Sequence, residues 1–186
     1  MYTIRAISLV LLISLVMLRS SALAGNTSYR PVTLVENGKP VTVIVIPTAP
    51  TPHELKAATE LQTCIRRMSG ALLPVVGDAA PEKPNEILLG RTSRSVRLLS
   101  GLDVAKLQQD GFRLATRGKK LIILGGSRKG TLYGVYTLLE DLLGCRMYTP
   151  TVTIVPERTT VTIPATDTTI VPFFRFRQVH YMNGFD

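Results

Sequence analysis

The sequence predicts an α+β domain, because short β-rich runs alternate along the chain with two apolar stripes of helical period. The β-rich runs are separated by turn residues such as Asn-Gly, Gly-Gly and Pro. The helical stripes cover residues 52–69 and 131–143, and each is followed by a glycine. Together these elements predict one domain with its own hydrophobic core.

Residues 1–24 have the pattern of a secretory signal peptide. Arg5 precedes the apolar run ISLVLLISLVML of residues 7–18, and Ala22-Leu23-Ala24 forms an A-x-A cleavage site. The alternative is a membrane anchor, but twelve helical residues reach only about 18 Å of a hydrocarbon core of about 30 Å. We therefore expect export to the periplasm, cell surface or exterior, with no membrane attachment after cleavage.

The remaining chain has room for one domain, expected at residues 25–165, but not for an additional catalytic barrel of about 250 residues. Its charge is basic, with 22 Lys and Arg against 13 Asp and Glu in the whole chain. Nucleic-acid binding would require these charges to gather with aromatic residues on one face, whereas they are scattered. We expect no nucleic-acid partner, and attraction to anionic glycans or uronic acids is a second interpretation of the charge.

The first half predicts a hairpin, a helix and two strands. Residues 29–35 and 41–46 flank the turn ENGKP, and the apolar run VTVIVI suggests a strand covered on both faces. The helix at 52–69 has Glu54 near its start, Arg66 and Arg67 near its end, and Gly70 after it. Residues 72–76 and 86–89 predict short strands, and residues 98–109 a loop with a helical turn.

The second half contains the block GFRLATRGKKLIILGGSRKGTLYGVYTLLEDLLGCRMYTP of residues 111–150. Residues 112–116 and 121–124 predict a second hairpin, and the next helix begins near Thr131. Gly130 and Gly134, about one turn apart, would let this helix approach its neighbour closely. Beyond it, residues 152–155 and 160–163 are β-rich, and residues 166–186 predict a linker and the first strand of a following domain.

Two motifs invite a functional interpretation that their spacing does not support. The unit LIILGGSRKGTLYG lacks the spacing of dinucleotide and P-loop motifs, so its glycines are interpreted as turn and packing residues. His53-Glu54 begins like a zinc-protease helix, but Ala57 stands where the second histidine would be. We expect neither a metal nor a cofactor.

The acidic residues predict no catalytic pair. Glycoside hydrolysis requires two carboxyl groups about 5–9 Å apart across the bond. The adjacent Glu140 and Asp141 diverge on their helix, and Glu54 and Glu60 are displaced around theirs, as on a solvated polar face. Cys64 and Cys145, 81 positions apart, match no metal or redox motif, so buried free thiols are favoured over a disulfide.

The chain resembles the non-catalytic N-terminal domain, like hexosaminidase domain 2, that α-glucuronidases of glycoside hydrolase family 67 share with family 20 β-N-acetylhexosaminidases. The resemblance covers about residues 30–177 and rests on four segments in order: AATELQTCIRRMSGALLPVV, EILLG, DGFRLATRGKKLIILGGSRKGTLYGVYTLLEDLLG and PFFRFR. It implies a two-layer sandwich, with a mixed sheet and two main helices on one face. It also implies a C-terminal (β/α)8 barrel, missing from this chain, that holds the catalytic acids.

By the same resemblance, the parent protein would act on a glycan in polysaccharide degradation, as an α-glucuronidase does in xylan catabolism. Arg177 would be a substrate-binding residue of that parent. The hexosaminidase pattern has Pro, then a sugar-binding Arg, then Asp; Pro172 and Arg177 match it, whereas Met182 replaces the Asp. The alternative function is a stand-alone carbohydrate-binding or cell-envelope module without enzymatic activity.

Overall fold

The computed structural model describes residues 30–149 and 151–174, and a six-stranded mixed sheet forms its centre. The strand order is β11-β6-β7-β5-β3-β4, in which β7, β5, β3 and β4 are parallel while β6 and β11 are antiparallel to their neighbours. The strands are β3 (Val43–Ile46), β4 (Val75–Gly77), β5 (Glu86–Leu89), β6 (Phe112–Arg117), β7 (Lys120–Gly125) and β11 (Asp167–Ile170).

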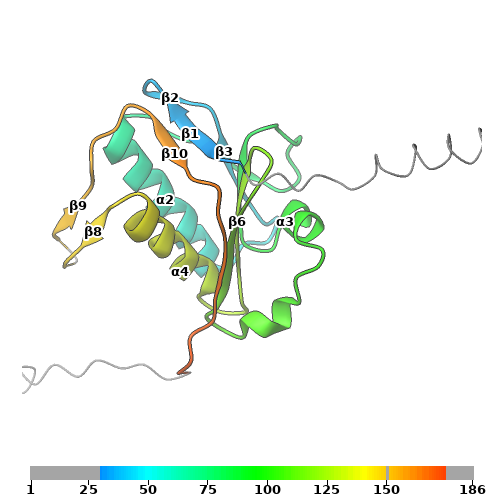
Figure 1. The fold of residues 1–186 in the computed structure, drawn as a ribbon. Coiled ribbons are helices and arrows are strands. Elements are labelled where there is room, and N and C mark those ends of the chain that lie inside the picture. Colours follow the sequence, from blue (N-terminus) through cyan, green and yellow to red (C-terminus); the bar gives the residue numbers. More distant parts are fainter. Residues whose placement is uncertain (1–29, 150, 175–186) are drawn as a thin grey trace, which may run out of the picture.

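Two main helices pack side by side on one face of this sheet (Figure 1). They are α2 (Pro52–Ser69) and α4 (Gly130–Thr137), and one turn of π-helix, η2 (Leu138–Leu142), continues α4. The buried side of α2 carries the predicted stripe, including Leu61, Ile65 and Met68. The predicted α+β sandwich, with two main helices on one face of a mixed sheet, is confirmed.

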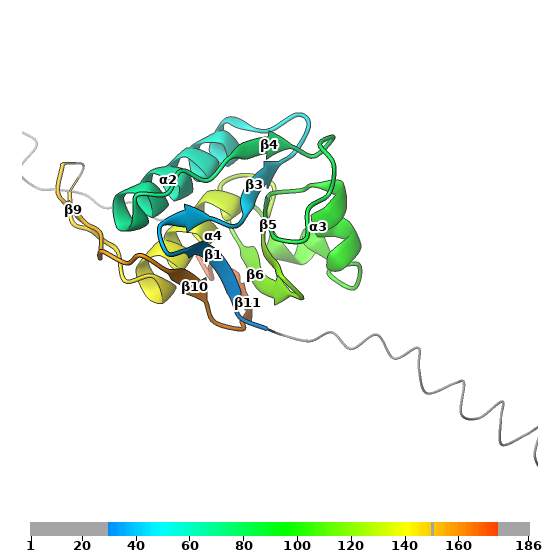
Figure 2. The same cartoon turned by 90° about the horizontal axis from the view of Figure 1, so that it is seen from above.

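Shorter elements cover the opposite face, as Figure 2 shows for α3. They are α3 (Ser93–Leu98) and the 3-10 helix η1 (Val104–Leu107), of which the sequence predicted only a helical turn within 98–109. A second, smaller core lies beneath them, containing Val43, Val45 and Ile122. Because Ile44 points into the helix-side core instead, β3 is covered on both faces, as its unbroken apolar run predicted.

The predicted opening hairpin is only half right. β1 (Val32–Glu36) turns at Asn37 and Gly38, which have φ of 48° and 74°, and pairs with β2 (Lys39–Pro40). β2 has only two residues and ends at Pro40. The chain then crosses into the central sheet as β3, while β10 (Val161–Ile163) takes the other side of β1.

The end of the described chain corrects the expected linker. A small hairpin, β8 (Arg146–Met147) and β9 (Thr153–Ile154), projects beside the helices (Figure 1). The next segment crosses back, and Asp167–Ile170, expected to begin a linker, pairs with β6 as the edge strand β11. The sheet therefore extends past residue 165. The expected signal peptide and the expected strand containing Arg177 lie outside the described residues.

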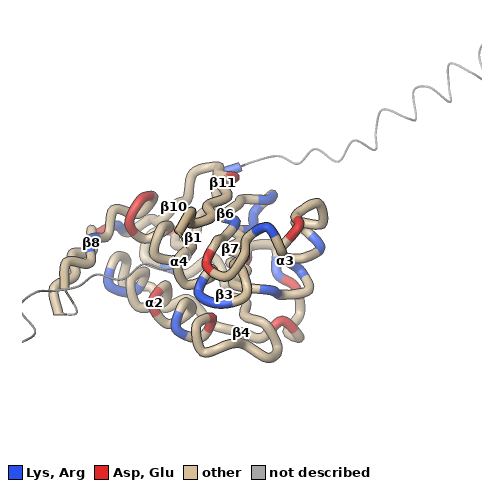
Figure 3. The backbone as a smooth tube through the Cα atoms, turned by 90° about the horizontal axis from the view of Figure 1, so that it is seen from below, with Lys and Arg blue, Asp and Glu red and all other residues tan. Residues whose placement is uncertain are grey.

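None of the helices in the described part of the chain is long and apolar enough to cross a membrane. Basic and acidic residues are scattered over its backbone, as Figure 3 shows.

Candidate functional site

An open cavity of about 1220 Å³ lies at the carboxyl ends of β3, β5 and β7. Ligands of open α/β sheets bind at this edge, because loops and helix N-termini converge there. The walls come from the loops after the three strands, the start of α2, the η1 region and the chain beyond β11. Representative lining residues are Glu54, Arg91, Asp103, Arg128 and Phe174.

The glycine turn between β7 and α4 forms one wall, and its backbone donors are already used. The N–H groups of Gly126, Ser127 and Arg128 donate to the carbonyls of Gly111, Gln108 and Gln109, at 2.8, 3.0 and 2.9 Å. The N–H of Lys129 donates to the Asp110 carboxylate at 3.4 Å. A phosphate-binding turn would direct such donors at its ligand, so this geometry does not support the phosphate interpretation.

The glycines of this turn allow close packing, as the sequence predicted. A Cβ on Gly125 would collide with the backbone N of Thr131, and one on Gly130 with the carbonyl O of Gly111. A Cβ on Gly134 would stand 2.5 Å from Ile123 Cγ2. Because glycine has no Cβ at these positions, α4 can start directly against the end of β7 and lie close on the sheet.

Two carboxylates at the cavity cap helices. Glu54 forms a capping box with Thr51: its Oε2 accepts from the Thr51 N–H at 2.8 Å, and Thr51 Oγ1 accepts from the Glu54 N–H at 3.2 Å. Its Oε1 also accepts from the Arg91 N–H at 3.4 Å, which ties α2 to the loop after β5. Asp103 caps η1 by accepting from the Ala105 N–H at 3.1 Å.

The other residues considered from the sequence also have surroundings typical of a structural role. Glu60 pairs with Lys56 at 2.7 Å on the outer side of α2, and Asp141 is exposed on η2. His53 is half-buried in the first turn of α2, while Ala57 is buried. In the described ranges, no three His, Cys, Asp or Glu side chains gather as metal ligands. Cys64 and Cys145 are both free and buried in the structure.

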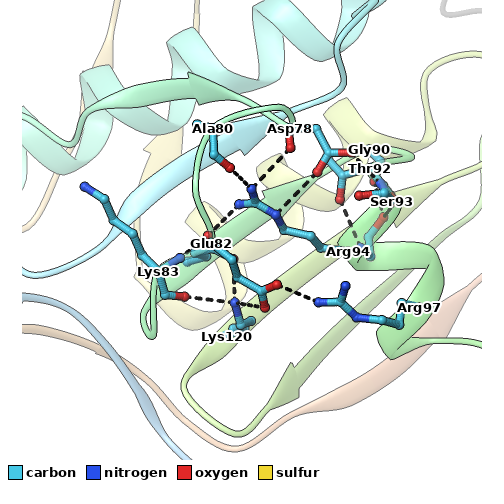
Figure 4. Close-up of polar contacts among 12 residues, drawn as sticks. Asp78, Ala80, Glu82, Lys83, Gly90, Thr92, Ser93, Arg94, Arg97 and Lys120 are labelled. Carbon is cyan, nitrogen blue, oxygen red and sulfur yellow. Dashed lines mark hydrogen bonds and ion pairs between the residues drawn. The ribbon is translucent and has the colours of Figure 1, made fainter.

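A second gathering of charged side chains, which the sequence did not predict, lies at the amino ends of β5 and β7 (Figure 4). We call it the Arg94 cluster. Its members are the acids and bases Asp78, Glu82, Glu86, Arg94, Arg97 and Lys120.

The cluster is built around the fully buried Glu86. Its Oε1 accepts from Arg94 Nη1 at 2.6 Å and its Oε2 from Lys120 Nζ at 2.5 Å. Glu86 and Lys120 begin adjacent parallel strands and stand opposite each other in register, which brings their side chains together. Since Arg94 also donates to the carbonyls of Asp78 and Ala80, the cluster attaches the loop after β4 to the sheet and to α3.

The exposed side of the cluster is completed by Glu82. Hydrogen bonds from Lys120 and Arg97, at 2.9 and 2.7 Å, lower the pKa of Glu82 from 4.5 to about 2. The buried charges thus have partners of opposite sign at hydrogen-bond distance, as ion pairs inside proteins require. We therefore interpret the Arg94 cluster as a structural clamp.

The sequence that forms most of these two places matches a known family. The family described as "Glycosyl hydrolase family 67 N-terminus" matches residues 28–138. The chain belongs to this family. The resemblance predicted from the sequence is therefore confirmed, and the chain contains the N-terminal domain of family 67 α-glucuronidase-like proteins.

Relatives of this family 67 domain are much longer proteins. The "Probable alpha-glucuronidase A" of Aspergillus terreus is 34% identical over 87 residues, which make up 46% of this chain and 10% of that protein. The chain thus matches about a tenth of the length of this curated relative. Most of that larger protein, to which the name α-glucuronidase refers, is not matched by this chain.

Solved structures share the fold of the family 67 domain at lower identity. BtGH115A, a family GH115 4-O-methyl-α-glucuronidase with specificity for decorated arabinogalactans, superposes with a TM-score of 0.53 and 21% identity, over 75% of this chain and 18% of that chain. The GH20 β-N-acetylhexosaminidase of Streptomyces coelicolor A3(2) superposes with a TM-score of 0.50 and 15% identity, over 81% of this chain and 26% of that chain. These two similarities establish a common fold.

Proposed function

We propose that this chain is the non-catalytic N-terminal accessory domain of an exported glycoside hydrolase that degrades polysaccharide, with an α-glucuronidase-like parent. The observation that carries the proposal is the family match across residues 28–138. The acids of the described residues add support, because Glu54 and Asp103 cap helices and Glu86 lies in a closed ion cluster. Each of these three carboxylates is held by hydrogen-bond donors of the domain itself.

The parent would contribute a C-terminal (β/α)8 catalytic domain and bind the glycan there. The described chain leaves the sheet after Ile170 and runs along the cavity, where Pro172 and Phe174 form part of the wall. Phe173 and Phe174 are 91% and 67% exposed and stack edge to face, with ring centroids 5.0 Å apart. Large exposed aromatic side chains are typical of surfaces that another structure covers, as a following domain would.

Export is part of the proposal and rests on residues 1–24. The apolar run after Arg5 and the A-x-A site favour cleavage after Ala24 and release outside the cytoplasm. N-terminal sequencing of the protein recovered from its native host would test this. A mature protein starting at Gly25 is expected, and a retained Met1 would contradict export.

The test of function compares this chain with a longer protein that carries the polypeptide encoded after Asp186. Both are incubated with oligosaccharides bearing α-linked glucuronic acid, and the released uronic acid is measured. We expect release by the longer protein and none by the 186-residue chain. Release by this chain alone would refute the non-catalytic role. Tight glycan binding by this chain, without activity in any longer protein, would indicate a carbohydrate-binding module instead.

Arg177 is proposed as a sugar or uronate contact in the parent. Its guanidinium could form paired hydrogen bonds with a carboxylate or neighbouring hydroxyls, which the ammonium of lysine cannot reproduce. In an active longer protein, Arg177→Lys should reduce kcat/KM by roughly 10- to 100-fold. The matched control is Lys119→Ala, in the exposed turn between β6 and β7, which should leave kcat/KM unchanged. Equal kcat/KM for both variants would remove Arg177 from the site.

A further inference from the structure

Four arginines gather at one end of the helical layer, where the β8–β9 hairpin projects (Figure 1). Two are in the last turn of α2, one is in β8, and one follows β9. We call them the arginine surface: Arg66, Arg67, Arg146 and Arg158. All four residues are exposed to solvent.

Hydrogen bonds and strand pairing bring these segments together. Arg67 Nη2 donates to the Thr153 carbonyl at 2.9 Å, which fastens the end of α2 to β9. β9 pairs with β8, the strand that contains Arg146. The N–H of Arg158 donates at 2.8 Å to the carbonyl of Met68, the residue after Arg67. The arginines therefore share one surface although they are far apart in the sequence.

Contacts with the backbone hold the guanidinium groups of this surface in place. Arg146 Nη1 donates to the Glu140 carbonyl at 2.7 Å. Arg158 Nη2 lies 3.7 Å from the point where a Cβ on Gly144 would stand. Because Arg67 and Arg146 each use a guanidinium nitrogen to hold a carbonyl, they have less side-chain freedom to lose when a ligand binds.

The protein does not neutralise these four charges. Among the described residues, the salt bridges include none of the four, whereas every base of the Arg94 cluster pairs with an acid. The acids nearest in sequence, which form no ion pair with this surface in the same ranges, are Glu140, Asp141 and Glu157. The helix dipole favours Arg66 and Arg67 in the last turn of α2, but it offsets their charge only in part.

A hollow and exposed apolar side chains border the arginine surface. The hollow, of about 420 Å³, is lined by Gln62, Thr63, Arg66, Arg67 and Leu72. Leu72 in the hollow and Tyr148 on the hairpin are 52% and 66% exposed. A sugar ring has apolar C–H faces that pack on such side chains, and polar edges that bond to amides and hydroxyls. The combination of arginines with these neighbours suits a sugar that carries a carboxylate.

We propose that the arginine surface binds acidic polysaccharide, a polymer whose sugars carry carboxylates. An arginine forms two parallel hydrogen bonds with a carboxylate, in a geometry that lysine cannot reproduce. Several arginines on one surface engage several carboxylates of one polymer, so contacts that are weak singly add together. The choice of a glycan over another polyanion rests on the function proposed above. The surface would keep the parent protein on its polymer between cleavage events.

The experiment titrates the 186-residue chain with polygalacturonate, in which every sugar carries a carboxylate, by isothermal titration calorimetry. Two further probes are dextran, which is uncharged, and poly-L-glutamate, which carries carboxylates without sugars. We expect binding to polygalacturonate that weakens with added salt, weaker binding to poly-L-glutamate and none to dextran. Absence of binding to polygalacturonate would overturn the proposal. So would equal affinity for poly-L-glutamate, which would indicate an acidic polypeptide as the partner.

The variant Arg66→Gln/Arg158→Gln locates the binding site. Neither of these side chains holds a backbone carbonyl in the described part of the chain, so the fold should stay intact. The Kd for polygalacturonate should rise roughly 10-fold or more, since hydrogen bonds to charged groups are lost. The matched control, Lys106→Gln/Lys119→Gln, loses the same net charge at exposed positions of η1 and the β6–β7 turn. Equal weakening by both variants would mean that net charge binds the polymer, and would overturn the proposal.

Tyr148→Ala separates the sugar contact from the charge. Its affinity for polygalacturonate should fall roughly 3- to 10-fold, because an aromatic contact is lost. Its affinity for poly-L-glutamate should not change. A variant that binds both polymers as the wild type does would overturn the choice of a sugar polymer as the ligand.

These measurements are independent of the test of the proposed function. They use this chain alone and no cleavage, whereas that test measures uronic acid released from oligosaccharides by a longer protein. Release by the longer protein without polymer binding by this chain would refute the arginine surface and leave the proposed function standing. Polymer binding without release by any longer protein would support the surface and refute the hydrolase parent.

Discussion

Gly134 shows how a single missing Cβ sets the distance between α4 and the sheet. A Cβ there would lie 2.5 Å from Ile123 Cγ2 and 3.1 Å from Phe112 Cδ2. Gly134→Ala gains helix propensity of about 1 kcal/mol, but overpacking costs about 1–3 kcal/mol. We expect a net loss of up to about 2 kcal/mol in the free energy of unfolding, measured by urea denaturation.

Gly101→Ala is the matched control, because a Cβ at Gly101 meets nothing within 4 Å. Its free energy of unfolding should change by no more than about 0.5 kcal/mol. A Gly134 variant as stable as this control would mean that α4 does not need the close approach.

Glu86 is the residue on which the Arg94 cluster depends. Glu86→Gln removes a fully buried negative charge and leaves Arg94 and Lys120 close together without it. Breaking a buried ion pair costs about 3–5 kcal/mol, so denaturant unfolding should show a loss of that size. Glu82→Gln, which removes the exposed partner of Lys120, is the comparison and should have a much smaller effect. Equal effects of the two substitutions would contradict the central role of Glu86.

Glu82 gives a pH dependence with a definite sign. Its pKa is about 2 in the folded protein and 4.5 ordinarily, because Lys120 and Arg97 bind the charged form. Its contribution to stability is therefore present above about pH 4.5 and disappears as the pH falls towards 2. Wild type and Glu82→Gln should converge in stability over that interval. Salt should shrink the difference at neutral pH, since the side chain is 43% exposed; a difference that grows in acid would contradict this account.

Residue roles were predictable where they depend on backbone geometry. The positions of Asn37, Gly38 and Gly70 follow from the positive φ that their turns require. The Arg94 cluster was not predictable, because its members come from segments whose contact depends on the register of parallel strands. An Arg and a Glu eight positions apart give no local signal that both will be buried.

The stability of α2 depends on the capping box at its N-terminus, which a single substitution can test. Thr51→Ala removes the acceptor for the Glu54 N–H and half of the capping box. Loss of such a cap costs about 1 kcal/mol, which thermal or urea unfolding would detect. Thr63→Ala, at an exposed position inside the same helix, is the control and should be neutral or slightly stabilising. Equal destabilisation by the two changes would show that the cap does not contribute.

Elements with a strong local pattern were predicted well, and so was the short strand β5, whereas the first hairpin and α3 were not. The helical spacing of its apolar residues and the residues typical of helix ends predicted α2. The β6–β7 hairpin was predicted from the alternation of apolar and polar residues on both sides of a turn that contains glycine. The prediction of the first hairpin was partly wrong, because the local sequence does not determine which sheet a strand joins. The helix α3 has six residues, too few to establish a period, and tertiary contacts of Arg94 and Leu99 hold it in place.

At the scale of the whole molecule, the end of the domain was the least predictable boundary. The segment 165–170, ATDTTI, is polar and has the composition of a linker, yet Asp167–Ile170 pairs with β6 along the edge of the sheet. Asp167 forms ion pairs with Arg113 and, at 2.9 Å, with Arg117. Edge strands are often polar because one side faces solvent, so composition alone cannot separate them from linkers.

This boundary leads to the last prediction, which compares two shortened proteins. A chain ending at Ala165 lacks β11, which leaves the edge of β6 that faces away from β7 unpaired and Arg113 and Arg117 without Asp167. We expect a lower Tm and concentration-dependent association by light scattering, since an open edge pairs with other chains. A chain ending at Phe174 keeps β11 and should remain monodisperse, with the Tm of the full chain. If the shorter protein matched it in both measurements, β11 would add nothing to the domain, and its end would lie at residue 165 after all.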